Sequence, residues 1–442
     1  MIAIPVLLFG LGAAGGRFAV VAETLYTMGP AGVLKNAVVV VEGGKIASIE
    51  KAVPAGVRIV KARAVMPGLV DLHTHLGVYA EPLVESHADG NEMSNPVTPH
   101  VRAIDAFHVA DPAIRAAVAG GTTTVIARPG SGNVIGGIGV LLKLKPGKGF
   151  AEMVVREEAD LKMALEWNPI LVYGGKGKTP ATRMAVYAIA RKAFVAAREY
   201  VAAWERYGRE KASGKRDAKE PDRDLGKEAL AKVLRREIPV HIHTARADEV
   251  IAALDFVEEF RLDAHIGHAE WGYLVAGEVA RRKGRVVVGP RLFRPNPETQ
   301  RLDNIAALYR KAGVEVALTT DHPVVAQGQF LTMAAHAVKY GLPRDDALRA
   351  LTIVPARFAR IDDRVGSIEK GKDADLVLLT GDPIELTTRV EEVYVDGVRV
   401  WSGKKDKSQR DGGETQREGA SFLAPSWLGG LALNPGSGAG AR

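Results

Sequence analysis

The chain is 442 residues long and 47% hydrophobic, which is enough to bury a large core. Its 59 Lys and Arg against 52 Asp and Glu give a formal net charge of +7. The charges gather in residues 198–236 and in the tail rather than along a basic stripe with interleaved aromatics, which argues against a nucleic-acid partner. With no cysteine, the sequence excludes disulfides, thiolate metal sites and a cysteine nucleophile.

Residues 1–16, MIAIPVLLFGLGAAGG, are apolar and end in small residues, as do the core and cleavage site of a secretory signal. They lack the basic residues that usually precede such a core, and they are too short to span a bilayer comfortably. We therefore expect no membrane partner. A periplasmic or secreted location and a cytoplasmic location both stay open.

Residues 17–66 consist of short β-branched runs separated by Gly and polar turns. Similar short β-branched runs occur within residues 353–404, where DG between VYV and VRVW is a strong hairpin signal. Neither segment has enough apolar surface to fold alone, so we expect the two to pair into one small β-sandwich. Residues 405–442 are charged and then rich in Gly and Ser, which predicts a tail with little order.

Between these segments, residues 67–352 alternate strand-like runs with helical segments. The runs are GLVDLHTH, TTTVIARP, GVLLKL, EADLKMAL, IPVHIHT, RLDAHIGH, RVVVGP and VEVALTTD. This alternation predicts a (β/α)8 barrel of the TIM type, with its chemistry at the C-terminal ends of the strands. A doubly wound open sheet is the alternative. Residues 182–236 are too long for one loop and predict an inserted helix pair that forms a lid, an oligomer surface or simply a solvated face.

Two histidines, His73 and His75, end the first barrel run in VMPGLVDLHTHLG. Because side chains alternate along a strand, both imidazoles point the same way. A pair of this kind at a strand end favours a metal site over two structural histidines. Asp71 lies two residues earlier on the same face, and we expect it to orient one of the imidazoles.

Further histidines and one carboxylate fall at the ends of later runs. They are His241 and His243 in the fifth run, His265 and His268 in the sixth, and Asp321 with His322 in the eighth. A barrel brings these strand ends together, so the pattern predicts several imidazoles and one carboxylate around a metal ion.

The motifs PGLVDLHTH, HIHTARADEV, IGHAEWGYL and TTDHP resemble those of the metal-dependent amidohydrolase superfamily, and in particular its imidazolonepropionase-like and prolidase-like branch. GTTTVI, GSGNVIGGIGV and GSIEKGKDADLVLL add to this resemblance, which covers residues 17–404. The resemblance implies a divalent ion, most commonly Zn2+. The ligands that it implies are His73, His75, His243, His268 and Asp321, with His241 and His265 as the alternatives on the fifth and sixth strands.

The resemblance also implies a lysine on the fourth strand, which two-metal members carry as a carbamate that bridges the ions. Lys162, in EADLKMAL, matches this context, and Lys143 is the alternative. A lysine can react in this way only where burial keeps its amine partly neutral. Without a bridging lysine, the site would hold a single ion.

The implied activity is hydrolysis of a C–N amide bond in a cyclic amide, a dipeptide-like or an N-acyl substrate. A metal-activated hydroxide would attack the carbonyl, with Asp321 as the proton shuttle. His322 and Tyr173 are candidate substrate contacts. A mononuclear deaminase of the same superfamily and an inactive scaffold homologue are the alternatives. We expect a small-molecule substrate and a homo-oligomer.

Overall fold

The computed structural model describes residues 16–403, and the following account is confined to them. The expected leader, apart from Gly16, and the expected tail at 405–442 lie outside the described residues. Within 16–403, no helix combines the length and the apolar character needed to cross a membrane.

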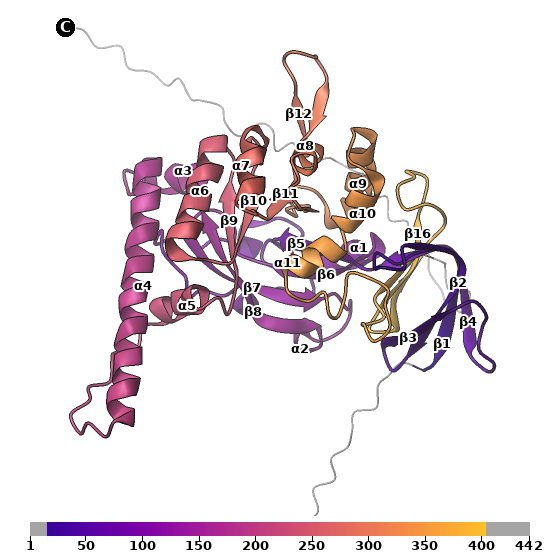
Figure 1. The fold of residues 1–442 in the computed structure, drawn as a ribbon, viewed down its shortest axis with the longest axis horizontal. Coiled ribbons are helices and arrows are strands. Elements are labelled where there is room, and N and C mark those ends of the chain that lie inside the picture. Colours follow the sequence, from indigo (N-terminus) through magenta and orange to yellow (C-terminus); the bar gives the residue numbers. More distant parts are fainter. Residues whose placement is uncertain (1–15, 404–442) are drawn as a thin grey trace, which may run out of the picture. The chain divides into compact units, whose positions relative to one another are not determined.

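Eight strands form one sheet that curls into a nearly closed, TIM-like barrel (Figure 1). Their order across the sheet is β14-β11-β10-β9-β8-β7-β6-β5. The strands are β5 (Leu69–Thr74), β6 (Thr122–Ala127), β7 (Ile135–Lys143), β8 (Val154–Ala164), β9 (Val240–Thr244), β10 (Ala264–His268), β11 (Val286–Val288) and β14 (Val316–Leu318). Each coincides with one of the eight predicted runs, so the prediction of the barrel strands is confirmed.

The expectation of strictly alternating parallel strands is wrong at β7. This strand pairs antiparallel with both neighbours. Lys143 of β7 lies opposite Thr124 of β6, and Gly137 of β7 lies opposite Lys162 of β8. The segment between the end of β6 and the start of β7 spans only residues 128–134. A parallel connection needs a dozen or more residues, so this short segment permits only a reversal of direction.

Side chains rather than a backbone ladder join the two end strands of the barrel, β5 and β14. Asp71 on β5 accepts hydrogen bonds from the Thr319 hydroxyl (2.6 Å), from the Thr320 amide (3.0 Å) and from its hydroxyl (2.7 Å), and from Gln327 Nε2 (2.7 Å). The Thr319 hydroxyl is also 2.6 Å from the carbonyl oxygen of His73. One buried carboxylate therefore anchors the closure of the barrel.

Helices surround much of the barrel sheet (Figure 1). They are α1 (Pro112–Ala119), α2 (Phe150–Met153), α3 (Trp167–Gly174), α4 (Arg183–Ala212), α5 (Leu225–Leu234), α6 (Ala247–Phe260), α7 (Ala276–Arg281), α8 (Ile305–Lys311), α9 (Phe330–Lys339), α10 (Arg344–Arg349) and α11 (Ile353–Phe358). Helix α11 contacts β5 and β14, and its apolar residues pack with Val70, Leu72 and Val287 to fill the base of the barrel.

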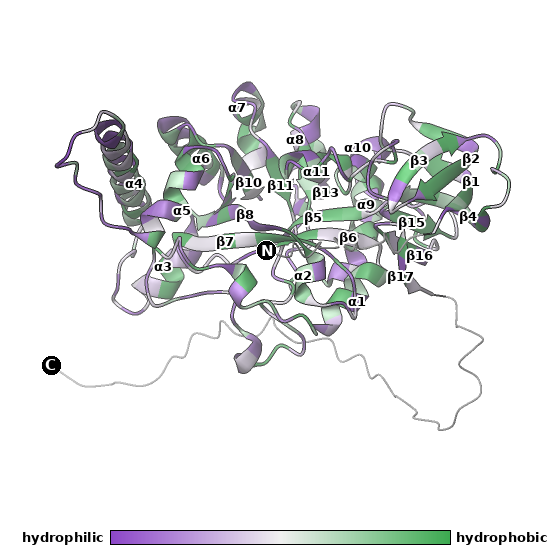
Figure 2. Cartoon of the chain, turned by 90° about the horizontal axis from the view of Figure 1, so that it is seen from below, coloured by the Kyte–Doolittle hydropathy of each residue, from purple (hydrophilic) through white to green (hydrophobic). Residues whose placement is uncertain are grey.

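The segment expected as an inserted helix pair contains α4 and α5. Thr182 caps α4, because its hydroxyl accepts a hydrogen bond from the amide of Ala185. Val186, Ala190, Phe194 and Ala197 recur at helical spacing and are buried against the core. Figure 2 shows the loop that follows α4 as strongly hydrophilic. The roles of this pair as a lid or oligomer surface stay predictions.

A second sheet combines strands from both ends of the described chain. Its order is β17-β16-β15-β4-β1-β2-β3, and the antiparallel pairing of β4 with β15 joins the two parts. The strands are β1 (Phe18–Tyr26), β2 (Val33–Glu42), β3 (Lys45–Glu50), β4 (Arg58–Pro67), β15 (Leu376–Leu379), β16 (Val390–Val395) and β17 (Val398–Ser402).

This sheet curls over itself rather than lying flat. Strands β1 and β16 are three places apart, which would separate them by about 14 Å in a flat sheet. The rings of Phe18 on β1 and Tyr394 on β16 nevertheless stack with centroids 5.2 Å apart. The curl encloses a separate apolar core, which includes Leu25 and Leu376.

Candidate metal centre

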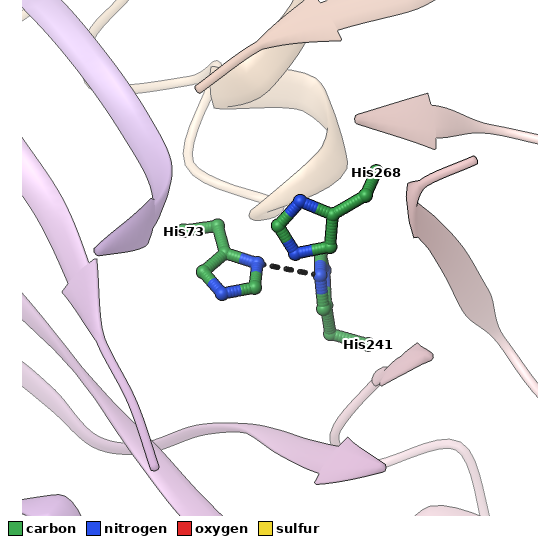
Figure 3. Close-up of side chains that lie close together, drawn as sticks. All are labelled: His73, His241 and His268. Atoms are coloured by element: carbon green, nitrogen blue, oxygen red, sulfur yellow. Dashed lines mark hydrogen bonds between the residues drawn. The ribbon is translucent and has the colours of Figure 1, made fainter. Parts of the chain in front are cut away.

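Three histidines from three barrel strands converge (Figure 3): His73 and His268 lie at the C-terminal ends of their strands, whereas His241 is the second residue of its strand. His73 lies on β5, His241 on β9 and His268 on β10, and each is buried. His73 Nδ1 is 2.8 Å from His241 Nε2, and the rings of His73 and His268 have centroids 4.7 Å apart. One nitrogen from each ring lies within 4.8 Å of the others, which makes this trio a candidate metal-ligand group.

A second candidate group shares His73 and adds His75 and Asp321. The Oδ1 atom of Asp321 is 3.2 Å from His73 Nε2 and 3.3 Å from His75 Nε2. Two ligands at about 2.1 Å from a tetrahedral zinc ion lie about 3.4 Å apart, so this spacing suits two ligands of one ion. His73 thus turns Nδ1 toward His241 and Nε2 toward Asp321.

Hydrogen bonds to carbonyl oxygens set the tautomers of two of these histidines. His75 Nδ1 is 2.8 Å from the carbonyl oxygen of Arg128, and His268 Nδ1 contacts that of Gly289. A carbonyl can only accept, so Nδ1 carries the proton in both rings and Nε2 keeps a lone pair. His268 Nε2 is buried without a hydrogen-bond partner. A free, buried lone pair of this kind fits a metal ligand.

Burial favours the neutral forms of His73 and His268, whereas neighbouring side chains keep Asp321 ionised. Desolvation, together with Lys162, lowers the pKa of His268 to about 4, and that of His73 well below its usual value. Burial by itself would raise the pKa of Asp321, but His268 and His75 outweigh it and lower the pKa. Neutral imidazoles next to an ionised carboxylate are the protonation states that a divalent cation requires.

On the fifth barrel strand, the structure brings His241 rather than His243 into a ligand group. Gly267 on β10 leaves room for the ring of His241, since a Cβ at residue 267 would lie 2.1 Å from His241 Nε2. The ring of His243 stacks on His268, with centroids 4.0 Å apart, but belongs to neither ligand group found among residues 16–403. The Nδ1 atom of His243 is buried without a hydrogen-bond partner, so His243 as the fifth-strand ligand stays a prediction beside His241.

Lys162 lies at the centre of the site, as expected for the fourth barrel strand. Its Nζ is 3.2 Å from His73 Nε2, and the side chain is 1% exposed. Desolvation, and next the nearby Arg128 guanidinium, lower the pKa of Lys162 to about 7. A large part of this amine is therefore neutral and nucleophilic near neutral pH.

The alternative lysine, Lys143, lies in a different part of the molecule. Its Nζ is 2.6 Å from Asp373, 3.1 Å from Asp375 and 2.5 Å from Asp396. Burial alone would lower the pKa of Lys143, but these carboxylates together raise it. Lys143 is thus a charged link between β7 and the segment around β15 and β16, and it is excluded as a bridging carbamate.

Asp71 does not orient an imidazole, contrary to expectation. Within its own strand its carboxylate accepts a hydrogen bond from the backbone amide of His73 (3.0 Å), and its other partners follow the end of β14. Its effect on the ligands is therefore indirect, because it fixes the backbone of β5 where His73 projects.

The two candidate substrate contacts are both buried. The hydroxyl of Tyr173 on α3 donates to Asn133 Oδ1 at 2.6 Å, and burial raises the pKa of Tyr173 to about 12. His322 follows Asp321, and its Nε2 is buried without a partner. The alternative sixth-strand histidine, His265, lies outside both ligand groups and places its Nε2 3.0 Å from the carbonyl oxygen of Phe358.

Sequence reasoning missed Arg128, which is fully buried at the end of β6. Its Nη2 pairs with Asp160 at 2.5 Å, and its carbonyl holds His75. The sequence did contain a signal for this residue, since an arginine directly follows the apolar run TTTVIA. An arginine is almost never fully buried without a specific partner, so its position at the end of a buried strand indicates one.

A family model described as the amidohydrolase family matches residues 64–400. The chain belongs to the amidohydrolase family. This result confirms the resemblance seen in the sequence motifs. Members of the family are metal-dependent, and the two ligand groups of this amidohydrolase could hold a metal ion.

Individual relatives support the same assignment. The amidohydrolase is 30% identical over 386 residues to the amidohydrolase tasK of Hapsidospora irregularis, a match that covers 81% of this chain but 39% of that protein. An imidazolonepropionase of Picrophilus torridus is 30% identical over 95 residues, or 20% of this chain and 24% of that protein. The crystal structure of an amidohydrolase from Thermotoga maritima MSB8 is 36% identical, covers 87% of this chain and all of that chain, and superposes with a TM-score of 0.79.

Proposed function

We propose that this amidohydrolase hydrolyses a C–N amide bond of a small molecule, either a cyclic amide, a dipeptide-like or an N-acyl compound. The observation that carries the proposal is the triangle of His73, His75 and Asp321, with spacings of 3.2 and 3.3 Å that suit ligands of one divalent ion. His241, His268 and Lys162 complete the proposed ligand set, and imidazole and carboxylate donors favour zinc.

When bound, a divalent ion at this site would supply Lewis acidity and lower the pKa of a water molecule toward about 7. Asp321 would accept the proton of the attacking water and deliver it to the departing nitrogen. Its lowered pKa supports the first of these steps, because the carboxylate is ionised at neutral pH. His75 Nε2 lies 3.3 Å from this carboxylate, and both atoms would be held in place as ligands of the ion.

Lys162 is the proposed site of carbamate formation. Its neutral Nζ would attack carbon dioxide and release one proton, which leaves a carbamate with two oxygen ligands. Burial and the pKa of about 7 support this role. With the carbamate, the ligand set would be large enough for two ions, and without it for one.

A deaminase is the second candidate, since the chain also matches adenine deaminase 2 of Bradyrhizobium diazoefficiens, with 36% identity over 95 residues (21% of this chain and 15% of that protein). Both candidates cleave a C–N bond, and the deaminase would use a single ion. The product distinguishes them, because a deaminase releases ammonia and an amide hydrolase releases a carboxylic acid with a primary or secondary amine.

The test is the substitution Asp321→Asn, assayed on a panel of dipeptides, N-acyl amino acids and cyclic amides with metal content measured in parallel. We expect kcat to fall by about 10²- to 10⁴-fold, the usual contribution of a positioned acid–base group. Asp105→Asn is the control, because Asp105 is exposed and pairs only with Arg102 in the described structure. Undiminished turnover by the Asp321 variant would exclude the proposed proton transfer.

A further inference from the structure

Two arginines and a glutamate gather at the rim of the barrel, next to the candidate metal centre. Glu270 lies two residues after His268, at the end of β10. Arg291 lies two residues after Gly289, whose carbonyl contacts His268. Arg294 belongs to β12 (Phe293–Pro295), which pairs with β13 (Leu302–Asn304) in the hairpin that projects beside α8 in Figure 1.

Both arginines share one carboxylate oxygen. Arg291 Nη1 is 3.3 Å from Glu270 Oε2, and Arg294 Nη2 contacts the same atom. Among residues 16–403, Glu270 is the single carboxylate in an ion pair with either arginine. The group therefore carries one positive charge in excess, and its Glu270 lies two residues along the chain from His268.

Arg294 is held in a fixed position with part of its hydrogen-bonding capacity unused. Its guanidinium lies 4.5 Å from the ring centroid of Trp271, and its side chain is only 16% exposed. Its Nε is buried without a partner. A desolvated guanidinium with a free N–H calls for a further acceptor, and a carboxylate matches its planar fork best.

We propose that Arg294 and Arg291 form a subsite for a free carboxylate of the substrate. The preferred substrates are then N-acyl amino acids or dipeptides, rather than uncharged cyclic amides. Glu270 is a positioning residue that holds the two arginines until the substrate carboxylate approaches, and the exposed face of Trp271 contacts the adjoining part of the substrate. This inference rests on the proposed amide hydrolysis.

The experiment compares an N-acetyl amino acid with the matching N-acetyl amino alcohol, in which CH2OH replaces the carboxylate. We expect the wild-type protein to prefer the acid in kcat/KM. In the double variant Arg291→Gln, Arg294→Met, this preference should fall by roughly 10- to 100-fold, mainly through KM. Arg281→Gln is the matched control, because Arg281 is exposed on α7, pairs with Glu278 and should leave the preference unchanged.

Glu270→Gln distinguishes a binding role from a merely structural one. If the arginines bind substrate, removing the competing carboxylate should lower KM for the acid several-fold. If the ion pair only holds the hairpin in place, this variant should instead impair the acid and the alcohol alike, as should the double variant. An unchanged acid preference in the folded, metal-loaded double variant would overturn the proposal.

Calorimetric titration with the same acid and alcohol gives a readout that is independent of turnover. Tighter binding of the acid that is lost in the double variant supports the subsite, even if neither compound is cleaved, in which case only the proposed hydrolysis fails. Hydrolysis of the acid and the alcohol at equal rates, with no dependence on the arginines, leaves the hydrolysis standing and removes the subsite.

Discussion

Replacing Gly267 with Ala should displace His241 and thereby weaken metal binding. An added Cβ would lie 2.1 Å from His241 Nε2, whereas ordinary van der Waals contact begins at 3.4 Å. The ring therefore has to retreat by about 1.3 Å, the difference between these two distances. Metal–ligand distances tolerate only about 0.2 Å. Since the backbone of Gly267 has no positive φ, Ala introduces no backbone strain, and the effect is confined to the ring.

We expect the dissociation constant for zinc to rise roughly 10- to 100-fold, as for other changes that misplace a ligand. Competition with graded chelators measures this constant, and circular dichroism verifies the fold. Gly277→Ala on α7 is the control, because no atom lies within 4 Å of the added Cβ. Unchanged affinity in both Gly267→Ala and His241→Ala, together with loss of metal in His243→Ala, would refute the assignment of His241 and restore His243.

Three further predictions follow from the lysines and the buried histidines. Lys162→Ala should reduce the metal content measured by elemental analysis from two ions to one or none, whereas Lys143→Met should retain it. Lys143→Met should instead lower the free energy of unfolding, measured in urea, by about 3–5 kcal/mol, because within residues 16–403 Lys143 is the only cation paired with the buried Asp375. Lys145→Met, which breaks a partly exposed pair with Asp396, should cost less than about 1 kcal/mol. Desolvation lowers the pKa of His265 to about 3, against an ordinary value of 6.5. As the pH falls, the unfolded chain therefore takes up this proton before the folded protein does, and the free energy of unfolding decreases from pH 6.5 toward pH 3. His265→Leu should reduce this dependence of the free energy of unfolding on pH by about 1.4 kcal/mol per pH unit. Urea unfolding midpoints at pH 4, 5 and 6 measure it.

The strands and the general position of the site follow from the sequence, because both depend on local patterns. Apolar, β-branched runs that alternate with helical segments mark the strands, and strand alternation places His73 and His75 on one face. The direction of β7 was missed, although the seven residues before it are too few for a parallel crossover. That reversal also explains Lys143, which ends β7 opposite Thr124 near the start of β6 and therefore lies away from the histidines.

The choice between His241 and His243 depends on register, which the sequence does not reveal. Both side chains lie on the same face of β9, and only the pairing with neighbouring strands decides which of them reaches the depth of the metal site. In the structure, His241 is opposite Lys162 on β8. The hydrogen-bond partners of Asp71 could not be predicted from the sequence either, because Thr319 and Thr320 are almost 250 residues away in the chain.

The closure between β5 and β14 has a consequence for the dynamics of the protein. His73 and His75 project from one side of this joint and Asp321 from the other, and in the backbone the His75 amide donates to the His322 carbonyl across it. An ion bound jointly by these side chains would link β5 to the segment after β14 and stabilise the closure of the barrel. Local opening and release of the ion would then be a single event, so slow amide hydrogen exchange at His75 should report directly on occupancy of the centre.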